Sequence, residues 1–125
     1  MSDKVKCLLV DDVEENLLAL EAVLAGDDRE IYKATSGPEA LELLLVHEFA
    51  LALLDIHMPT MDGLEFIRQV RKLPGYSKVP VFVLTSDVSR ARFVEGREVG
   101  ATAWLVKPPN LVSLVAVIRD ALGTA

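Results

Sequence analysis

Leu51-Ala52-Leu53-Leu54-Asp55 is the stretch that decides the fold, because four apolar residues in a row end abruptly in a carboxylate. Their lack of alternation is typical of a central parallel strand that helices cover on both faces. Three further apolar runs also end at a charged or hydroxyl side chain. They are Cys7-Leu8-Leu9-Val10 before Asp11 and Asp12, Val81-Phe82-Val83-Leu84 before Thr85, and Trp104-Leu105-Val106 before Lys107.

Segments with helical periodicity separate these runs and predict an alternating α/β fold. Strands are expected over residues 6–10, 30–34, 49–54, 79–84 and 103–106. Helices are expected over residues 15–25, 63–72 and 89–99. A further helix should begin at a Ser36–Glu39 capping box and run to about residue 46, and a last one should follow Asn110. Five strand–helix pairs with right-handed crossovers predict a five-stranded, doubly wound parallel sheet with strand order 2-1-3-4-5.

The polar residues that follow the strands are expected to meet at one edge of this sheet. Ligands of doubly wound sheets bind beyond the carboxyl ends of the strands, where the strand order reverses. For the order 2-1-3-4-5 this point lies between the strands that end in Asp11-Asp12 and in Asp55. Three carboxylates beside Thr85 and Lys107 are costly unless a divalent cation and a phosphoryl group use them. The sequence therefore predicts an aspartate site that handles phosphate.

Composition limits the classes of function. The 125 residues are 51% hydrophobic and 26% charged, which is ordinary for one globular domain over residues 1–125. The net charge of -6 argues against direct nucleic-acid binding. No stretch approaches the roughly 20 apolar residues of a membrane span, and no signal peptide is visible, so a cytoplasmic location without membrane insertion is expected. The single cysteine, Cys7, is interpreted as a small buried hydrophobe rather than a reactive thiol.

Across almost its whole length the chain resembles the receiver domain of bacterial two-component response regulators. The resemblance rests on five motifs that occur in the order and at the spacing of the family. They are Val10-Asp11-Asp12, Leu54-Asp55-Ile56-His57-Met58-Pro59-Thr60-Met61-Asp62-Gly63, Leu84-Thr85-Ser86, Gly100-Ala101 and Val106-Lys107-Pro108. The resemblance implies a flavodoxin-like (βα)5 fold and a role in phosphorelay signal transduction.

The resemblance also implies roles for the residues at the sheet edge. Asp55 would accept a phosphoryl group from a sensor histidine kinase, or from a phosphotransfer protein, in a Mg²⁺-dependent reaction. Lys107 would bridge Asp55 and the phosphoryl oxygens, and the family implies a cis Lys107–Pro108 peptide bond. The ligand set that the family implies for magnesium is Asp11, Asp12, Asp55 and the backbone carbonyl of His57.

The resemblance also implies that two residues change conformation on phosphorylation and that three others modulate the phosphorylation reaction. Thr85 would donate its hydroxyl to the phosphoryl group, and Trp104 takes the place of the family's aromatic switch residue. Whether Trp104 switches or only packs is left open by the sequence. The positions implied to tune the lifetime of the phosphoryl group or the access of the phosphodonor are His57, Ser86 and Asp87. A downstream effector is expected to bind the face formed by the fourth helix, the fifth strand and the last helix.

Two alternatives to a phosphorylated switch are compatible with parts of this pattern. One is a pseudo-receiver that binds partners without phosphorylation, against which the intact Asp12, Asp55, Thr85 and Lys107 argue. The other is a phosphatase of the haloacid-dehalogenase type, which carries a second aspartate two residues after its nucleophile. His57 stands at that position in this chain. The domain is therefore expected to assist its own phosphorylation and dephosphorylation without being an enzyme in the ordinary sense.

Overall fold

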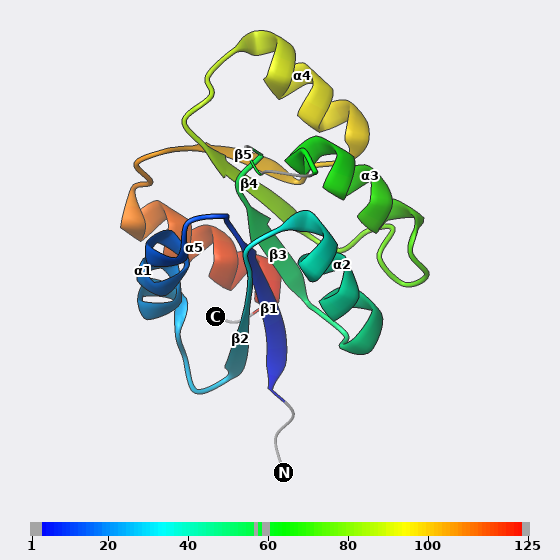
Figure 1. Cartoon of the computed structure of the whole chain (residues 1–125). Coiled ribbons are helices and arrows are strands. Elements are labelled where there is room, and N and C mark those ends of the chain that lie inside the picture. The colour runs from blue at the N-terminus through cyan, green and yellow to red at the C-terminus, as the bar shows by residue number, and fades with distance from the viewer. Residues whose placement is uncertain (1–3, 57, 59–60, 124–125) are drawn as a thin grey trace.

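The computed structural model describes residues 4–56, 58 and 61–123. Within them, five parallel strands form one sheet in the order β2-β1-β3-β4-β5, as predicted. The sheet runs through the centre of the molecule (Figure 1). The bounds of the strands are β1 Val5–Val10, β2 Arg29–Ala34, β3 Leu51–Leu54, β4 Val81–Thr85 and β5 Ala103–Val106.

Five helices cover the two faces of the sheet, with α1 and α5 on one face and α2, α3 and α4 on the other (Figure 1). Their bounds are α1 Glu14–Leu24, α2 Gly37–Val46, α3 Gly63–Lys72, α4 Arg90–Val99 and α5 Leu111–Leu122. None of the helices in the described part of the chain has the length and apolar character that a membrane span requires.

The core consists of two apolar clusters, one on each side of the sheet. Cys7 and Leu9 of β1 belong to the cluster under α1 and α5, whereas Leu8 and Val10 belong to the cluster under α2 and α3. All four side chains are buried. Successive residues of a strand point to opposite faces, so an uninterrupted apolar run requires apolar cover on both sides. The residues of β3 are divided in the same way, Leu51 and Leu53 into one cluster and Ala52 and Leu54 into the other, so the prediction that this strand is covered on both faces is confirmed.

Local side-chain signals set the helix ends. Ser36 Oγ accepts a hydrogen bond of 3.2 Å from the Glu39 amide, as the capping box predicts. The Glu39 carboxylate reaches back one residue further than the usual pattern and accepts a 2.6 Å bond from the Thr35 amide. Asn110 caps the start of α5, as expected, and further end signals are Asp62 at the start of α3 and left-handed Gly100 at the end of α4.

Two strands are shorter at their starts than the sequence predicts. β3 begins at Leu51 rather than Phe49, because the Phe49 amide donates to the Tyr76 hydroxyl at 3.1 Å instead of to a neighbouring strand. β4 begins after Pro80, which has no N–H to donate to a ladder. The other predicted ends differ from the structure by one residue or not at all, which is the ordinary uncertainty of element boundaries.

Candidate functional site

The register of the sheet brings Asp11 and Asp55 side by side. Val10 of β1 is paired with Leu54 of β3, and the Asp55 amide donates to the Val10 carbonyl at 3.1 Å. The two aspartates therefore leave neighbouring strands at the same level. Asp11 is buried, with only 3% of its side chain exposed, and 14% of the Asp55 side chain is exposed. Asp12, the next residue along, is exposed to solvent.

Lys107, the residue directly after β5, joins these two carboxylates. Its Nζ lies 2.9 Å from Asp55 Oδ2 and 3.3 Å from Asp11 Oδ2. Its amide donates to the Thr85 carbonyl at 2.8 Å, which fixes the start of the side chain beside β4. The Lys107–Pro108 peptide bond is cis, as the resemblance implies.

Burial and ion pairing act in opposite directions on Lys107. Partial burial lowers the pKa of its ammonium, but the hydrogen bond and the charge of Asp55 raise it, and Asp11 adds to this. The net pKa of Lys107 lies above its ordinary value. Lys107 is therefore a fixed positive charge at neutral pH, held against the carboxylate that the sequence singles out as the phosphoacceptor.

Asp11 has two further partners. Its Oδ1 accepts a 2.9 Å hydrogen bond from the Val13 amide, and its Oδ2 accepts a 3.2 Å bond from the side-chain amide of Asn16. Asn16 lies in the first turn of α1 and was not among the predicted site residues. The sequence signal that could have identified Asn16 is its position five residues after Asp11, in the first turn of the helix that follows the acidic pair.

Thr85 and Trp104 are linked through the backbone of Asp87. Thr85, the last residue of β4, is completely buried, and its Oγ1 accepts from the Asp87 amide at 3.1 Å. The Trp104 indole donates from Nε1 to the Asp87 carbonyl at 3.4 Å. The two predicted switch residues therefore hold opposite sides of one loop residue. Ser86, the residue between Thr85 and Asp87 in the sequence, is exposed.

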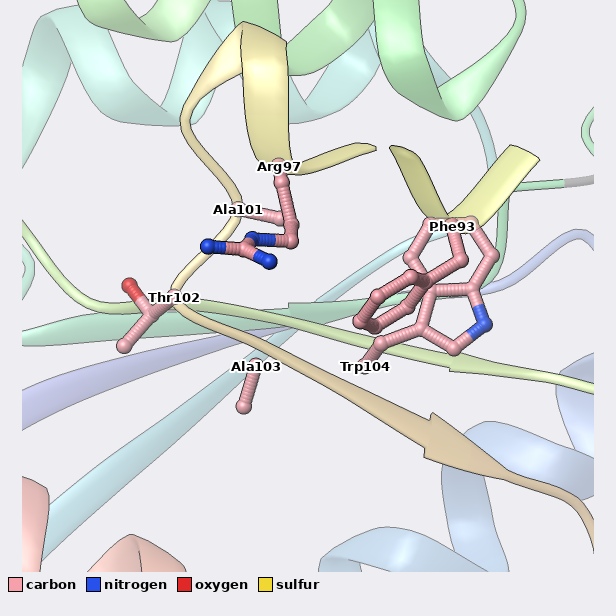
Figure 2. A pocket seen from close by; sticks show the side chains of 6 residues that line it. All are labelled: Phe93, Arg97, Ala101, Thr102, Ala103 and Trp104. Carbon is pink, nitrogen blue, oxygen red and sulfur yellow. The ribbon is translucent and has the colours of Figure 1, made fainter. Parts of the chain in front are cut away.

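The Trp104 ring lies between β5 and α4. Phe93 of α4 packs edge-on against it, with ring centroids 6.1 Å apart. Figure 2 shows the two rings in contact, with the guanidinium of Arg97 on the other side of a surface hollow. The residues that line this hollow are Phe93, Arg97, Ala101, Thr102, Ala103 and Trp104.

The predicted metal ligands agree with magnesium in donor type. His57 lies outside the described residues, so its carbonyl and its ring stay predictions. Among the residues that the structure does describe, no three His, Cys, Asp or Glu side chains form a metal-binding group. Magnesium keeps several waters and needs only one or two carboxylates, and hard carboxylate oxygens are available on Asp12 and Asp55. Asp11 is already occupied by Val13, Asn16 and Lys107.

The comparisons with known proteins agree with the fold. The family model for the response regulator receiver domain matches residues 7–119. The chain belongs to this family.

Two bacterial regulators are among the relatives of this chain. The response regulator PleD of Caulobacter vibrioides is 36% identical over 115 residues, which cover 92% of this chain and 25% of PleD. The transcriptional regulatory protein SrrA of Staphylococcus aureus is 35% identical over 101 residues, covering 81% of this chain and 41% of SrrA. The chain thus spans between a quarter and two fifths of the length of these relatives.

Solved structures with this fold include single receiver domains. The chemotaxis response regulator CheY4 of Vibrio cholerae has a TM-score of 0.87 at 34% identity, with 95% of this chain and 99% of CheY4 covered. A CheY-like receiver domain protein from Methanospirillum hungatei has a TM-score of 0.89 at 28% identity, with 97% and 95% covered. The chain is accordingly a receiver domain of phosphorelay signalling, and the pseudo-receiver and phosphatase alternatives are not favoured. Receiver domains of this family are generally signalling domains.

Proposed function

We propose that this chain is a working phosphoacceptor domain in which Asp55 receives a phosphoryl group from a histidine kinase or a phosphotransfer protein. The observation that carries the proposal is the Lys107 ammonium, 2.9 Å from Asp55 Oδ2 and 3.3 Å from Asp11 Oδ2. An Asp55 oxygen would form the new bond to phosphorus while the phosphorus–nitrogen bond of the phosphohistidine breaks. The histidine, protonated on its other ring nitrogen, would leave as a neutral imidazole.

Lys107 would act as a positioned charge. A phosphomonoester carries about -1.5 to -2 charges at neutral pH, which would add to the negative charge of the aspartates. The Lys107 ammonium is already within hydrogen-bonding distance of Asp55. It would therefore need little movement to reach the oxygens of a phosphoryl group attached to that carboxylate. Electrostatic stabilisation that is in place before the reaction is commonly the largest contribution to such transfers.

Receiver domains generally depend on Mg²⁺. In this chain Asp12 and Asp55 would supply the carboxylate oxygens, with the His57 carbonyl and the negative charge of Asp11 completing the set expected for the family. When bound, magnesium would supply positive charge that offsets the charge of the phosphoryl group. Asp12 is exposed, so it can exchange water for a cation without loss of a buried contact.

The contacts of Thr85 provide a route from the site to the surface. If the Thr85 side chain rotates to donate its hydroxyl to a phosphoryl oxygen, its Oγ1 would shift relative to the Asp87 amide that now donates to it. Asp87 also accepts from the Trp104 indole, so a movement of this loop would change the surface formed by α4, β5 and α5. We propose that a downstream effector binds this surface, and that Ser86, Asp87 and His57 tune the lifetime of the phosphoryl group. The domain would occupy residues 1–125.

The test is mass spectrometry after incubation with acetyl phosphate, with and without magnesium. The wild-type chain should gain a single phosphoryl group only when magnesium is present, and Asp55→Asn should gain none. Asp28→Asn, which changes an exposed carboxylate beside Arg29, is the matched control and should behave like the wild type. A wild-type chain that gains nothing, or that hydrolyses a phosphomonoester over many turnovers, would overturn the proposal.

A further inference from the structure

The hydrogen bonds of Asp11 are divided unevenly between its two carboxylate oxygens. Oδ1 accepts one bond, from the backbone amide of Val13 at 2.9 Å. Oδ2 accepts two, from the Asn16 side chain at 3.2 Å and from Lys107 Nζ at 3.3 Å. Asp11 as a residue is only 2% exposed, so water offers little replacement for a lost partner. The Asn16 amide is therefore the neutral donor that shares Oδ2 with the ammonium of Lys107.

The contact between Asn16 and Asp11 affects the phosphoacceptor because Lys107 Nζ donates both to Asp11 and to Asp55. Its Nζ lies closer to Asp55 Oδ2, at 2.9 Å, than to Asp11 Oδ2, at 3.3 Å. A buried carboxylate oxygen that loses one donor attracts the remaining donor more strongly. Loss of the Asn16 amide would thus draw the ammonium towards Asp11 and away from Asp55.

We propose that Asn16 is a positioning residue for phosphoryl transfer. Its amide holds the Asp11 carboxylate so that Lys107 stays directed at Asp55 and can pass to the phosphoryl oxygens. The inference rests on the proposed function of Asp55.

The residue type and the position of Asn16 both suit this role. An amide supplies an N–H without adding charge, whereas a cation at this place would compete with magnesium and a carboxylate would repel Asp11. Asn16 is held by its own backbone, since its amide N–H donates to the Val13 carbonyl at 3.1 Å. Val13 stands at the N-cap of α1 and provides no side-chain cap, so the start of this helix is tied to Asp11 through Val13 and Asn16.

The first experiment compares phosphorylation rates at saturating acetyl phosphate and magnesium. Asn16→Ala removes the donor, and the nearly isosteric Asn16→Asp replaces it with a repelling acceptor. Supporting residues around metal and reaction sites are commonly worth about 10-fold to 100-fold in activity, so we expect Asn16→Ala to be slower by about 10-fold and Asn16→Asp by more. Ser36→Ala is the control, because it removes a helix N-cap outside the site and should keep the wild-type rate.

A double-mutant cycle separates positioning from a general loss of structure. If Asn16 acts through Lys107, then Asn16→Ala should cost little further rate in a Lys107→Met background. Two losses that multiply, or an Asn16→Ala variant as fast as the wild type, would overturn the inference. The proposed function would still stand in that case, because the wild-type chain would still gain its phosphoryl group and Asp55→Asn would not.

A second measurement does not depend on activity. The side-chain amide of Asn16 gives its own pair of resonances in a ¹⁵N NMR spectrum of the metal-free, unphosphorylated protein. These resonances should shift in Asp11→Ala, because the acceptor at 3.2 Å is gone. They should remain in place in Ser36→Ala. Resonances that do not respond to Asp11→Ala would overturn the inference whatever the rates are.

Discussion

Gly96→Ala tests how Trp104 is seated on α4. A Cβ atom at Gly96 would lie 2.8 Å from Trp104 Cε3 and closer still to Cζ3. Both atoms belong to a rigid ring that Phe93 contacts from one side and that the Asp87 carbonyl holds through Nε1. An alanine at position 96 therefore cannot be accommodated unless the indole moves away from the helix.

Two effects of opposite sign decide the stability of this variant. Replacing glycine by alanine inside a helix stabilises it by about 1 kcal/mol. Forcing an extra methyl group into a packed site costs about 1–3 kcal/mol. We therefore expect Gly96→Ala alone to lower the free energy of unfolding by roughly 0–2 kcal/mol, since the clash at least matches the gain in propensity. In a Trp104→Ala background the ring is absent, and the same change should stabilise the protein by about 1 kcal/mol.

The assay is urea unfolding of the four proteins followed by far-UV circular dichroism, which does not depend on the only tryptophan. The sign of the Gly96→Ala effect should invert between the two backgrounds, with a coupling free energy of about 1–3 kcal/mol. Tryptophan emission of Gly96→Ala should also shift to longer wavelength as the indole moves into solvent. Equal stabilisation in both backgrounds would refute the contact between Trp104 and α4.

Three further predictions concern buried polar groups and titration. Tyr76→Phe should lower the free energy of unfolding by about 1–3 kcal/mol in urea titrations, because the hydroxyl accepts from the Phe49 amide and donates to the His47 carbonyl; an unchanged midpoint would contradict this. Burial raises the pKa of the Cys7 thiol to about 11, so a thiol reagent at pH 8 should label the protein in urea but leave the native protein unlabelled. The raised pKa of Lys107 implies stability that is fully present below its ordinary value of 10.5 and is lost above it. The difference in unfolding free energy between the wild type and Lys107→Met should therefore be constant from neutral pH to that point and then decrease; a difference that grows with pH would count against the ion pairs.

Most of the fold could be predicted because its signals are local. An uninterrupted apolar run such as Leu51–Leu54 indicates a strand covered on both faces, and the buried strand confirms it. Side chains such as Ser36 and Asp62 cap helices through contacts only two or three residues away, which sequence spacing reveals directly. The start of β3 was missed because the Phe49 amide bonds to Tyr76, a residue 27 positions away. The start of β4 was placed two residues too early because Pro80 has no N–H to donate to a ladder.

The main site residues could also be predicted, for a topological reason. Parallel strands direct their carboxyl ends to one edge, so Asp11, Asp55 and Lys107 had to gather there once the strand order was right. In the structure the Lys107 ammonium joins these residues through hydrogen bonds of 2.9 Å to Asp55 and 3.3 Å to Asp11. The roles of these residues in phosphoryl transfer, and the magnesium ligands, stay predictions.

The sequence by itself therefore determined the alternation of strands and helices, the edge of the sheet that carries the chemistry and the residue types at that edge. Only the tertiary structure decided that Asn16 and Lys107 donate to the same carboxylate oxygen of Asp11, and that Gly96 leaves room for the ring of Trp104. The physical reason is distance along the chain. The carboxyl ends of the strands and the helix caps follow from neighbouring residues. The contacts of Asn16 and Gly96 depend instead on how α1 and α4 lie against the sheet, which is fixed by the packing of the whole core.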